Sequence, residues 1–554
     1  MIVAIDYHAP PVSANLLIAR QSAQPGQTFA SSPPVPGALA APGNAASAGA
    51  NNTGQMQTIY GQMWYHRIHI VPAVVNLGSV ATHQVRNFEV WNAHFSAKTL
   101  TSIDSAGDAS GLAITGQPAP PLDFGPLCSR MYALHAHVNG APLIDVRYIF
   151  GFGGDSPVFA VTGLRLAIWA LRPNWAGGVT ERMEWATDVM PAYAGVEQRV
   201  RLRQHARRSL EMDFAAAGHE ARRAENLLFG WGGRKYCVPI WPERERLGAP
   251  VAQGATSVTV SDAALKDYRV GGFVVFWSSE SRADALEIES IAGDLLTLSA
   301  PVARSYPAGA SVCPGIVARL DGETPLRRST DALIEGRVRF LDEDARDRAP
   351  AEIGPIYDGY AVLDERPDRA LDVDERWART LEVLDNLSGL VTIDDATRAP
   401  VIRRSLSWLI AGRAAIHKWK RWAAARAGRA NALWLPTHAD DMHVTADIGA
   451  GDTAITVRHA DAARLVGMHP MRSALRLELA DGTIIHRRIT GVSELSEHSE
   501  MIGINSALGF AVPTANVRRA MWLQLARLDA DALEFRYETD SIVRLTTTFR
   551  IVAQ

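Results

Sequence analysis

Hydrophobic and polar residues alternate in short runs along residues 63–171, and glycine or proline separates the runs. Alternation with a period of two is typical of a strand that buries one face. Within residues 85–91, the pattern predicts that Val85 and Trp91 share one face while Arg86 and Asn87 turn away. Short strands at such close intervals predict an immunoglobulin-like β-sandwich over residues 63–172.

Beyond this region the sequence contains an internal duplication. Glu181-Arg182 recurs as Glu375-Arg376, and Pro242 recurs as Pro436, each 194 residues later. The tetrapeptide Arg-Arg-Ser-Leu occurs at 207 and 403, and Ala-Arg-Leu-Asp occurs at 318 and 526. Because these anchors keep their order while their spacing grows slowly, they indicate one repeated unit with loops of different length.

Both copies have the same predicted order of elements. A strand ends near Arg-Arg-Ser-Leu, a helix-compatible segment follows, and a Trp-Pro strand leads to short strands joined by glycine turns. We predict a mainly β chain with minor α content, in which each copy of an α+β unit carries an inserted small β-barrel or sandwich module. The predicted parts are copy 1 at 173–345 with its module at 251–318, a linker at 346–366, and copy 2 at 367–554 with its module at 448–526.

The N-terminal residues 1–62 differ in composition from the rest. Residues 21–58 are mainly Ala, Gly, Pro, Ser, Gln and Asn, and such a segment buries too little apolar surface to offset the entropy of ordering. Residues 2–5 and 16–18 are each compatible with a short strand. We expect N-terminal strands followed by a flexible arm, which either lies on a neighbouring subunit or is a linker without a further role.

Charge and cysteine content exclude several classes of protein. The 56 Lys and Arg nearly balance the 59 Asp and Glu, so no overall field favours specific nucleic-acid binding or an anionic membrane. Three separated cysteines without a Cys-x-x-Cys pair indicate neither a disulfide framework nor a thiolate zinc site. No stretch approaches about 18 uninterrupted apolar residues, so we expect no signal peptide and no membrane span.

Catalytic motifs are weak throughout. The sequence has no phosphate-binding G-x-x-x-x-G-K-[ST] loop and no G-x-S-x-G elbow. Gly154-Asp155-Ser156 resembles a hydrolase nucleophile, but Pro157 follows and the run joins two predicted strands, which favours a turn. The acidic runs 341–344 and 372–375 are interpreted as solvated faces. We therefore assign no catalytic residue and no cofactor.

Several histidines offer metal-ligand chemistry. His438, Asp440, Asp441 and His443 lie close in sequence, but the corresponding part of copy 1 has no histidine, so we interpret the group as a solvated loop without a metal. Six histidines of the first domain are predicted to occupy alternating strand positions and not to be ligands: His66, His69, His83, His94, His135 and His137.

The predicted helix of copy 2 interleaves basic residues with tryptophan. Its cations are Lys418, Lys420, Arg421, Arg426 and Arg429, and its tryptophans are Trp419 and Trp422. Such a pattern is compatible with contact to DNA or an acidic partner. We favour the alternative, in which both rings face the core and the cations lie on the solvent side.

The chain from about Met63 onward resembles virion tail proteins of Mu-like siphophages of Pseudomonas and its relatives. The resemblance rests on the VWNAHF segment at 90–95, the EQR segment at 197–199 with the following Arg-Arg-Ser-Leu, and the Gly-Arg to Trp-Pro step. It implies a non-enzymatic structural subunit of the tail tip or baseplate, assembled in the host bacterial cytoplasm. Such a subunit is expected to form a ring that connects the tail tube to hub and fibre proteins.

Two further inferences concern assembly and an alternative role. Three chains that each carry two copies present six similar units, which suits a sixfold tail tube, so a trimer is favoured over a hexamer. The alternative function is a glycan- or cell-surface-binding protein of the virion, built from the same β modules. A tail-associated hydrolase would need a convergent acid pair or nucleophile, which the sequence does not indicate.

Overall fold

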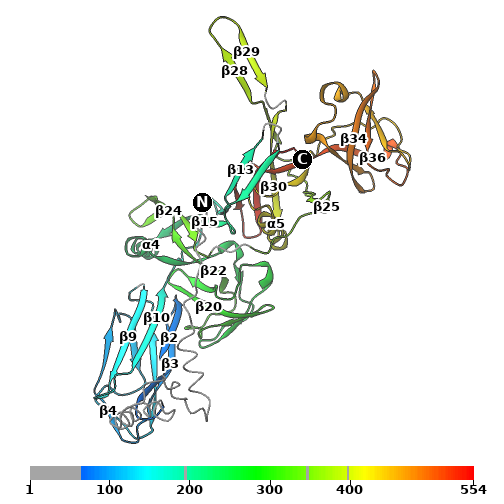
Figure 1. Cartoon of the computed structure of the whole chain (residues 1–554). Helices are drawn as coiled ribbons and strands as arrows, with labels where there is room; N and C mark the ends of the chain where they lie inside the picture. The colour runs from blue at the N-terminus through cyan, green and yellow to red at the C-terminus, as the bar shows by residue number, and fades with distance from the viewer. Residues whose placement is uncertain (1–63, 142, 193–195, 345–347, 396–398, 554) are drawn as a thin grey trace, which may run out of the picture.

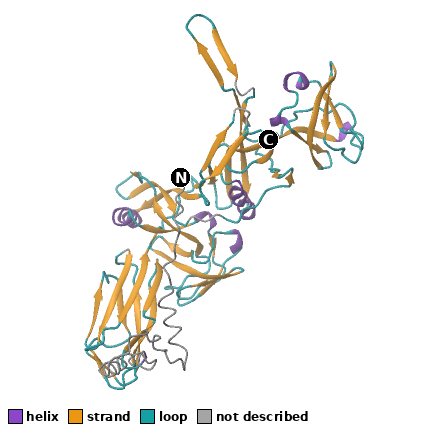
Figure 2. Ribbon diagram, viewed as in Figure 1, coloured by secondary structure: helices purple, strands orange, loops and turns teal. Residues whose placement is uncertain are grey.

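The computed structural model describes residues 64–141, 143–192, 196–344, 348–395 and 399–553 (Figure 1). The arm predicted at 21–58 and the strands predicted before it lie outside these ranges. Strands dominate the described residues, whose two α-helices are α4 (Gly218–Trp231) and α5 (Arg413–Arg426) (Figure 2). The prediction of a mainly β chain with minor α content is therefore confirmed.

Two four-stranded sheets form the N-terminal sandwich, seen at the lower left of Figure 1. The first sheet contains β1 (Ile68–Val71), β3 (Gln84–Asn92), β8 (Ser129–Ala136) and β6 (Leu112–Thr115), in that order. The second contains β2 (Val74–Val80), β10 (Val158–Arg165), β9 (Leu143–Gly151) and β5 (Ser102–Ala106). A short pair, β4 (Lys98–Leu100) and β7 (Leu122–Phe124), completes the domain.

Strand β3 corrects one prediction from the alternating pattern. Phe88 and Val90 are its buried hydrophobic residues, and the Phe88 ring stacks on Phe159 of the opposite sheet at 4.1 Å between centroids. Val85 and Trp91 share the outer face, and Asn87 lies with them because residues two apart point the same way. The predicted shared face of Val85 and Trp91 is therefore correct, and only the placement of Asn87 with Arg86 is wrong, because adjacent residues of a strand point to opposite faces.

The two copies repeat the same elements. Copy 1 begins earlier than the predicted residue 173, because β11 (Ala167–Ile168) pairs with its strand β16 (Lys235–Pro239). Its elements are β11, β12 (Val179–Glu184), β13 (Thr187–Pro191), β14 (Glu197–Arg201), β15 (Arg207–Ala217), α4, β16, β17 (Glu245–Arg246), β22 (Ser311–Leu320), β23 (Leu326–Arg328) and β24 (Leu333–Asp342). Copy 2 contains β27 (Asp374–Ala378), β28 (Leu381–Asp385), β29 (Val391–Asp395), β30 (Val401–Ala411), α5, β31 (Leu433–Pro436), β36 (Val517–Leu528), β37 (Ala532–Tyr537) and β38 (Ile542–Ile551).

Strand pairing is also repeated between the copies. The pairs β12–β15, β15–β24, β16–β22, β22–β24 and β23–β24 correspond to β27–β30, β30–β38, β31–β36, β36–β38 and β37–β38. The hairpin β13–β14 likewise corresponds to β28–β29. Arg-Arg-Ser-Leu lies at or near the start of a long strand in both copies, which corrects its predicted place at a strand end.

Each copy carries an inserted β module with its own core. The module of copy 1 contains β18 (Ser257–Thr259), β19 (Phe273–Ser279), β20 (Arg282–Ala292) and β21 (Leu295–Leu298). The module of copy 2 contains β32 (Ala454–Arg458), β33 (Ala474–Leu479), β34 (Ile484–Ser496) and β35 (Ser499–Ile504). Strands β22 and β36 join these modules to their parent units by pairing with β19 and β33.

The segment between the copies, predicted as a linker, packs against copy 2. It includes the short strands β25 (Ile356–Tyr357) and β26 (Tyr360–Ala361), and Val362 and Leu363 after them are buried. Val362 forms a parallel bridge with Trp434, as β11 pairs in parallel with β16 in copy 1. This segment is therefore the structural counterpart of β11.

Candidate functional site: the interface between the two copies

The two copies dock edge to edge through β12 and β37. These strands pair antiparallel, with Val179 opposite Tyr537, Glu181 opposite Phe535 and Glu184 opposite Ala532. Since β12 belongs to copy 1 and β37 to copy 2, the pairing joins two different edges of equivalent units. Such a contact is heterologous, or head-to-tail, and differs from a twofold contact.

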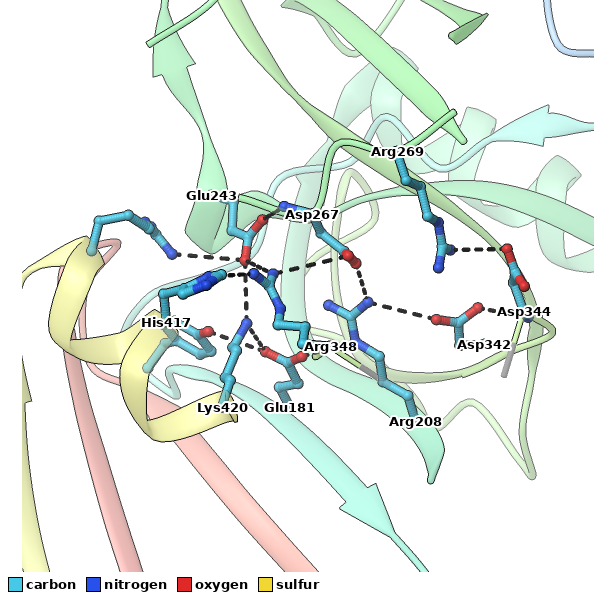
Figure 3. A network of polar contacts seen from close by, with 12 residues as sticks. Glu181, Arg208, Glu243, Asp267, Arg269, Asp342, Asp344, Arg348, His417 and Lys420 are labelled. Atoms are coloured by element: carbon cyan, nitrogen blue, oxygen red, sulfur yellow. Dashed lines mark hydrogen bonds and ion pairs between the residues drawn. The ribbon is translucent and has the colours of Figure 1, made fainter. Parts of the chain in front are cut away.

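A buried charge network lies behind this strand pair and crosses from one copy to the other (Figure 3). Lys420 on α5 of copy 2 places its Nζ atom 2.6 Å from Oε2 of Glu181 and 3.2 Å from Oε1 of Glu243, both in copy 1. All three side chains are about 1% exposed. Tyr537 of β37 donates a hydrogen bond from Oη to the same Oε2 of Glu181 at 3.0 Å.

Arginines extend the network. Arg208 donates from Nε to Glu181 Oε1 at 2.8 Å, and its Nη1 atom pairs with Asp267 and lies 3.6 Å from Oδ2 of Asp342. Arg348 places Nη2 3.1 Å from Glu243 Oε1 and donates from Nη1 to Nδ1 of His417 at 2.7 Å. Each buried carboxylate at the centre thus faces at least one cation.

Electrostatics at the network favour the charged forms of its central carboxylates. Burial alone would raise the pKa of Glu181, but Arg208 and Lys420 outweigh it and hold that pKa at about 2. The pKa of Glu243 is lowered in the same way, against burial, by Lys420 and Arg348. At the edge of the network, the effect of burial on Asp342 is larger than the opposing effect of Arg208, so the pKa of Asp342 is raised to about 6.

This arrangement is suited to holding two units in register. A cavity of about 30 Å³ beside Glu181 and Lys420 has room for a water molecule and not for a substrate. A buried ion pair contributes little net stability compared with apolar packing, but removing one partner leaves an uncompensated charge. The network therefore disfavours any docking of the copies that separates Lys420 from its two carboxylates.

The hairpin β13–β14 adds a second contact between the copies. Glu197 on β14 accepts two hydrogen bonds from Arg527 on β36, from Nε at 2.6 Å and from Nη2 at 2.9 Å. Both side chains are 2% exposed, so this bidentate pair is fully enclosed. The hairpin of copy 1 thus reaches onto the sheet of copy 2.

Several residues that the sequence predictions placed in solvent are buried in the structure. Trp419 and Trp422 are buried, as predicted, but Lys420 and Arg426 are buried as well, so the assignment of all cations to the solvent side was wrong. Asp342, assigned to a solvated acidic run, has a side chain only 2% exposed. The prediction failed because periodicity within one helix or strand does not show a face that other elements cover, whether they come from the other copy, as for Lys420, or from elsewhere, as for Arg426 and Asp342.

A sequence signal for part of this network existed. Glu181 and Arg208 recur as Glu375 and Arg404, and the Nε atom of Arg404 lies 2.6 Å from Oε1 of Glu375. Acidic and basic residues that recur together in both copies indicate a paired charge. No comparable signal marks Lys420, because α4 lacks a lysine at any position.

The other predicted residues are distributed over the chain. Gly154-Asp155-Ser156 lies between β9 and β10, as the turn prediction expected, and Oδ2 of Asp155 is 2.5 Å from Nε2 of His94. His69 and His135 lie on strands, whereas His66, His83, His94 and His137 lie outside strands, which corrects their predicted positions. The rings of His83, His135 and His137 stack, with centroids 4.8 to 5.3 Å apart.

The group at 438–443 is not the solvated loop that was predicted. His443 and Asp440 are exposed, but His438 is 3% exposed, and neither ring nitrogen has a hydrogen-bond partner in the described chain. Burial, and then Arg476 and Arg369, lower the pKa of His438 to about 3. Within the described ranges, no three His, Cys, Asp or Glu residues are grouped as metal ligands.

Models of known protein families give no match to the sequence, and neither do curated proteins. Among the described helices, none has the length and apolar character required to span a membrane.

Proposed function

We propose that this chain is a structural subunit of a bacteriophage tail tip or baseplate that assembles with copies of itself and with other tail proteins. The observation that supports this proposal is the head-to-tail docking of its two copies through β12 and β37. A heterologous contact can repeat indefinitely, and it closes into a ring when the rotation between units permits. The resemblance of residues 90–95 and 197–210 to virion tail proteins supports the same function.

Three chains are the favoured assembly, ahead of six. Each chain contributes two similar units, so three chains present six units to a sixfold tail tube. The ring would connect the tube to hub and fibre proteins, with assembly in the host cytoplasm and a final location in the virion.

The particle itself provides the test. Reconstruction of the phage tail should place this chain at the end of the tail tube, with both copies at one radius. The proposal fails if mass spectrometry of purified particles lacks the chain, or if the copies of a reconstructed chain occupy different radii.

The proposal includes no enzymatic activity. Two of the most enclosed acidic residues, Glu181 and Glu243, are paired with cations, and Glu181 lies beside a cavity of about 30 Å³. We expect no turnover of peptidoglycan, lipopolysaccharide or nucleic acid by the purified chain. Turnover that disappears when one Asp, Glu or Ser is substituted would contradict this part of the proposal.

A second candidate function, glycan binding at the host surface, is favoured by one feature of the sandwich. Aromatic rings gather near β1 and β3, where Tyr65 and Phe95 are exposed and stack at 5.2 Å, and where the partly buried rings of His69 and Trp91 stack at 5.3 Å. Aromatic faces of this kind offer flat apolar surfaces to a ligand. Binding of cell-surface glycans that is lost in Trp91→Ala and kept in Trp377→Ala would support this candidate, and absence of binding would exclude it.

A further inference from the structure

We propose that β27 of one chain pairs antiparallel with β23 of a second copy of this chain, and that this contact repeats between chains the β12–β37 contact inside the chain. The inference rests on the proposed assembly function and specifies its interface. The interface follows from the equivalence of the two copies.

The strand β27 is the counterpart of β12. Glu375 of β27 lies 194 residues after Glu181 of β12, and each strand pairs with the long strand that follows its hairpin. In copy 1 the other edge of β12 is covered by β37. In copy 2 all five residues of β27 are exposed, including Trp377 at 52%, so that edge is open in the described chain.

The strand β23 is the counterpart of β37. Leu326 pairs with Gly336, and Phe535 pairs with Leu545, so both strands correspond at a spacing of 209 residues. The edge of β37 is covered by β12, whereas all three residues of β23 are exposed. The edges of β23 and β27 are therefore open in the described chain, whereas the equivalent edges of β37 and β12 pair with each other.

The internal contact fixes the register expected between chains. Glu181 faces Phe535, and Thr180 faces Arg536. Transferred to the open edges, Glu375 faces Leu326 of the second copy, and Asp374 faces Arg327. This register sets the acidic start of β27 against the basic end of β23, Arg327-Arg328, and opposite charges across a strand pair are favourable.

The hairpin β28–β29 supports the same docking. Its counterpart β13–β14 covers Arg527 of β36 through Glu197. In contrast, β28–β29 projects from the chain at the top of Figure 1, and its large apolar side chains are at least 45% exposed: Leu381, Val383, Leu384, Leu387, Leu390, Val391 and Ile393. A group of exposed apolar side chains of this size is typical of an interface.

The internal duplication indicates which strand of the next chain the β28–β29 hairpin contacts. Arg319 of β22 lies 208 residues before Arg527, in the same Ala-Arg-Leu-Asp sequence. Arg319 is exposed and pairs with Glu343 in its own chain. The β28–β29 hairpin of one chain would thus lie over β22 of the next, while main-chain hydrogen bonds join β27 to β23.

Cysteine cross-linking of the full chain tests the register. Asp374→Cys and Arg327→Cys are combined in a Cys128→Ser background, since Cys237 and Cys313 are buried. Directly opposite residues of an antiparallel pair lie within disulfide range. Mild oxidation should link separate chains. Each single cysteine variant, and the pair Ala378→Cys with Arg327→Cys, should remain at least tenfold less cross-linked.

Native mass spectrometry of the same samples separates the two levels of the proposal. A ring whose chains do not cross-link at 374 and 327 overturns the strand pairing and leaves the assembly function standing. A chain that neither cross-links nor forms an oligomer overturns both. Cross-linking that is equally efficient at position 378 overturns the register.

Discussion

Lys420 of the second copy lies 2.6 Å from Glu181 of the first, and both side chains are 1% exposed. Its ammonium group also approaches Glu243, so one cation holds two carboxylates of the other copy. The docked pair of copies is thus specified by buried charge as well as by strand pairing.

Substitution Lys420→Met should destabilise the contact between the copies by about 3–5 kcal/mol, because it leaves Glu181 and Glu243 buried without their shared cation. Thermal unfolding followed by tryptophan fluorescence measures this, since Trp419 and Trp422 lie on the same helix. The matched control is Lys418→Met. Lys418 pairs with Glu365 at an exposed position, so its loss should change stability by about 0–1 kcal/mol. Equal effects of the two substitutions would contradict the role of Lys420.

Asp342 should give the folded chain a measurable pH dependence. Burial raises its pKa from 3.8 to about 6, so the folded state binds this proton more tightly than the unfolded state does. The stabilisation is fully present below about pH 3.8 and is lost as pH rises through about 6. Glu181 acts oppositely: its pKa is held at about 2, below its ordinary 4.5, so its contribution is lost as pH falls from about 4.5 towards 2.

Between about pH 5.5 and 6.5, where Glu181 is almost fully ionised in both states, the titration of Asp342 can be examined separately. Denaturation of Asp342→Asn across this window should show that the gain in stability on acidification is smaller than in the unaltered chain. If the stability of Asp342→Asn and that of the unaltered chain change equally with pH, Asp342 does not titrate in this window.

A charge exchange tests the contact between chains. Asp374→Arg and Arg327→Glu should each weaken self-association roughly tenfold, because each places like charges opposite one another across the strand pair. The double variant restores opposite charges and should recover most of the association, as measured by analytical ultracentrifugation. Additive losses in the double variant would mean that the two residues do not meet.

The hairpin β28–β29 should contribute to assembly without stabilising the single chain. Leu387 and Leu390 are 92% and 81% exposed, so their replacement by serine should change thermal stability by only about 0.5 kcal/mol. Self-association should fall. The control is Leu465→Ser, at a residue 72% exposed in the module of copy 2. Loss of association in the control as well would indicate a general effect of surface polarity.

The sequence predicted those features that depend on local pattern and repetition. The offset between Glu181 and Glu375 predicted equivalent strands, and the spacing of Trp419 and Trp422 predicted the buried face of α5. The burial of Lys420 was not predictable in this way, because it arises when one copy docks against the other, and that of Asp342 was not, because it depends on neighbours from other elements of copy 1, among them Arg208. Hydrophobic periodicity describes the faces of a single element and does not show a face that a neighbouring copy covers.

The open edges β23 and β27 were also beyond prediction from sequence. Their residues, such as Arg327 and Asp374, resemble ordinary charged surface, which proteins use to keep edge strands from pairing indiscriminately. Only the structure shows that the counterparts of both edges are already paired within the chain.

Native mass spectrometry of the assembled full chain tests the central claim most directly. Head-to-tail closure of three chains predicts one dominant species at three times the chain mass of 60.1 kDa, with a ring of six similar units. A monomer at every concentration, or a dimer that does not grow further, would contradict the account, because neither presents a ring of six similar units.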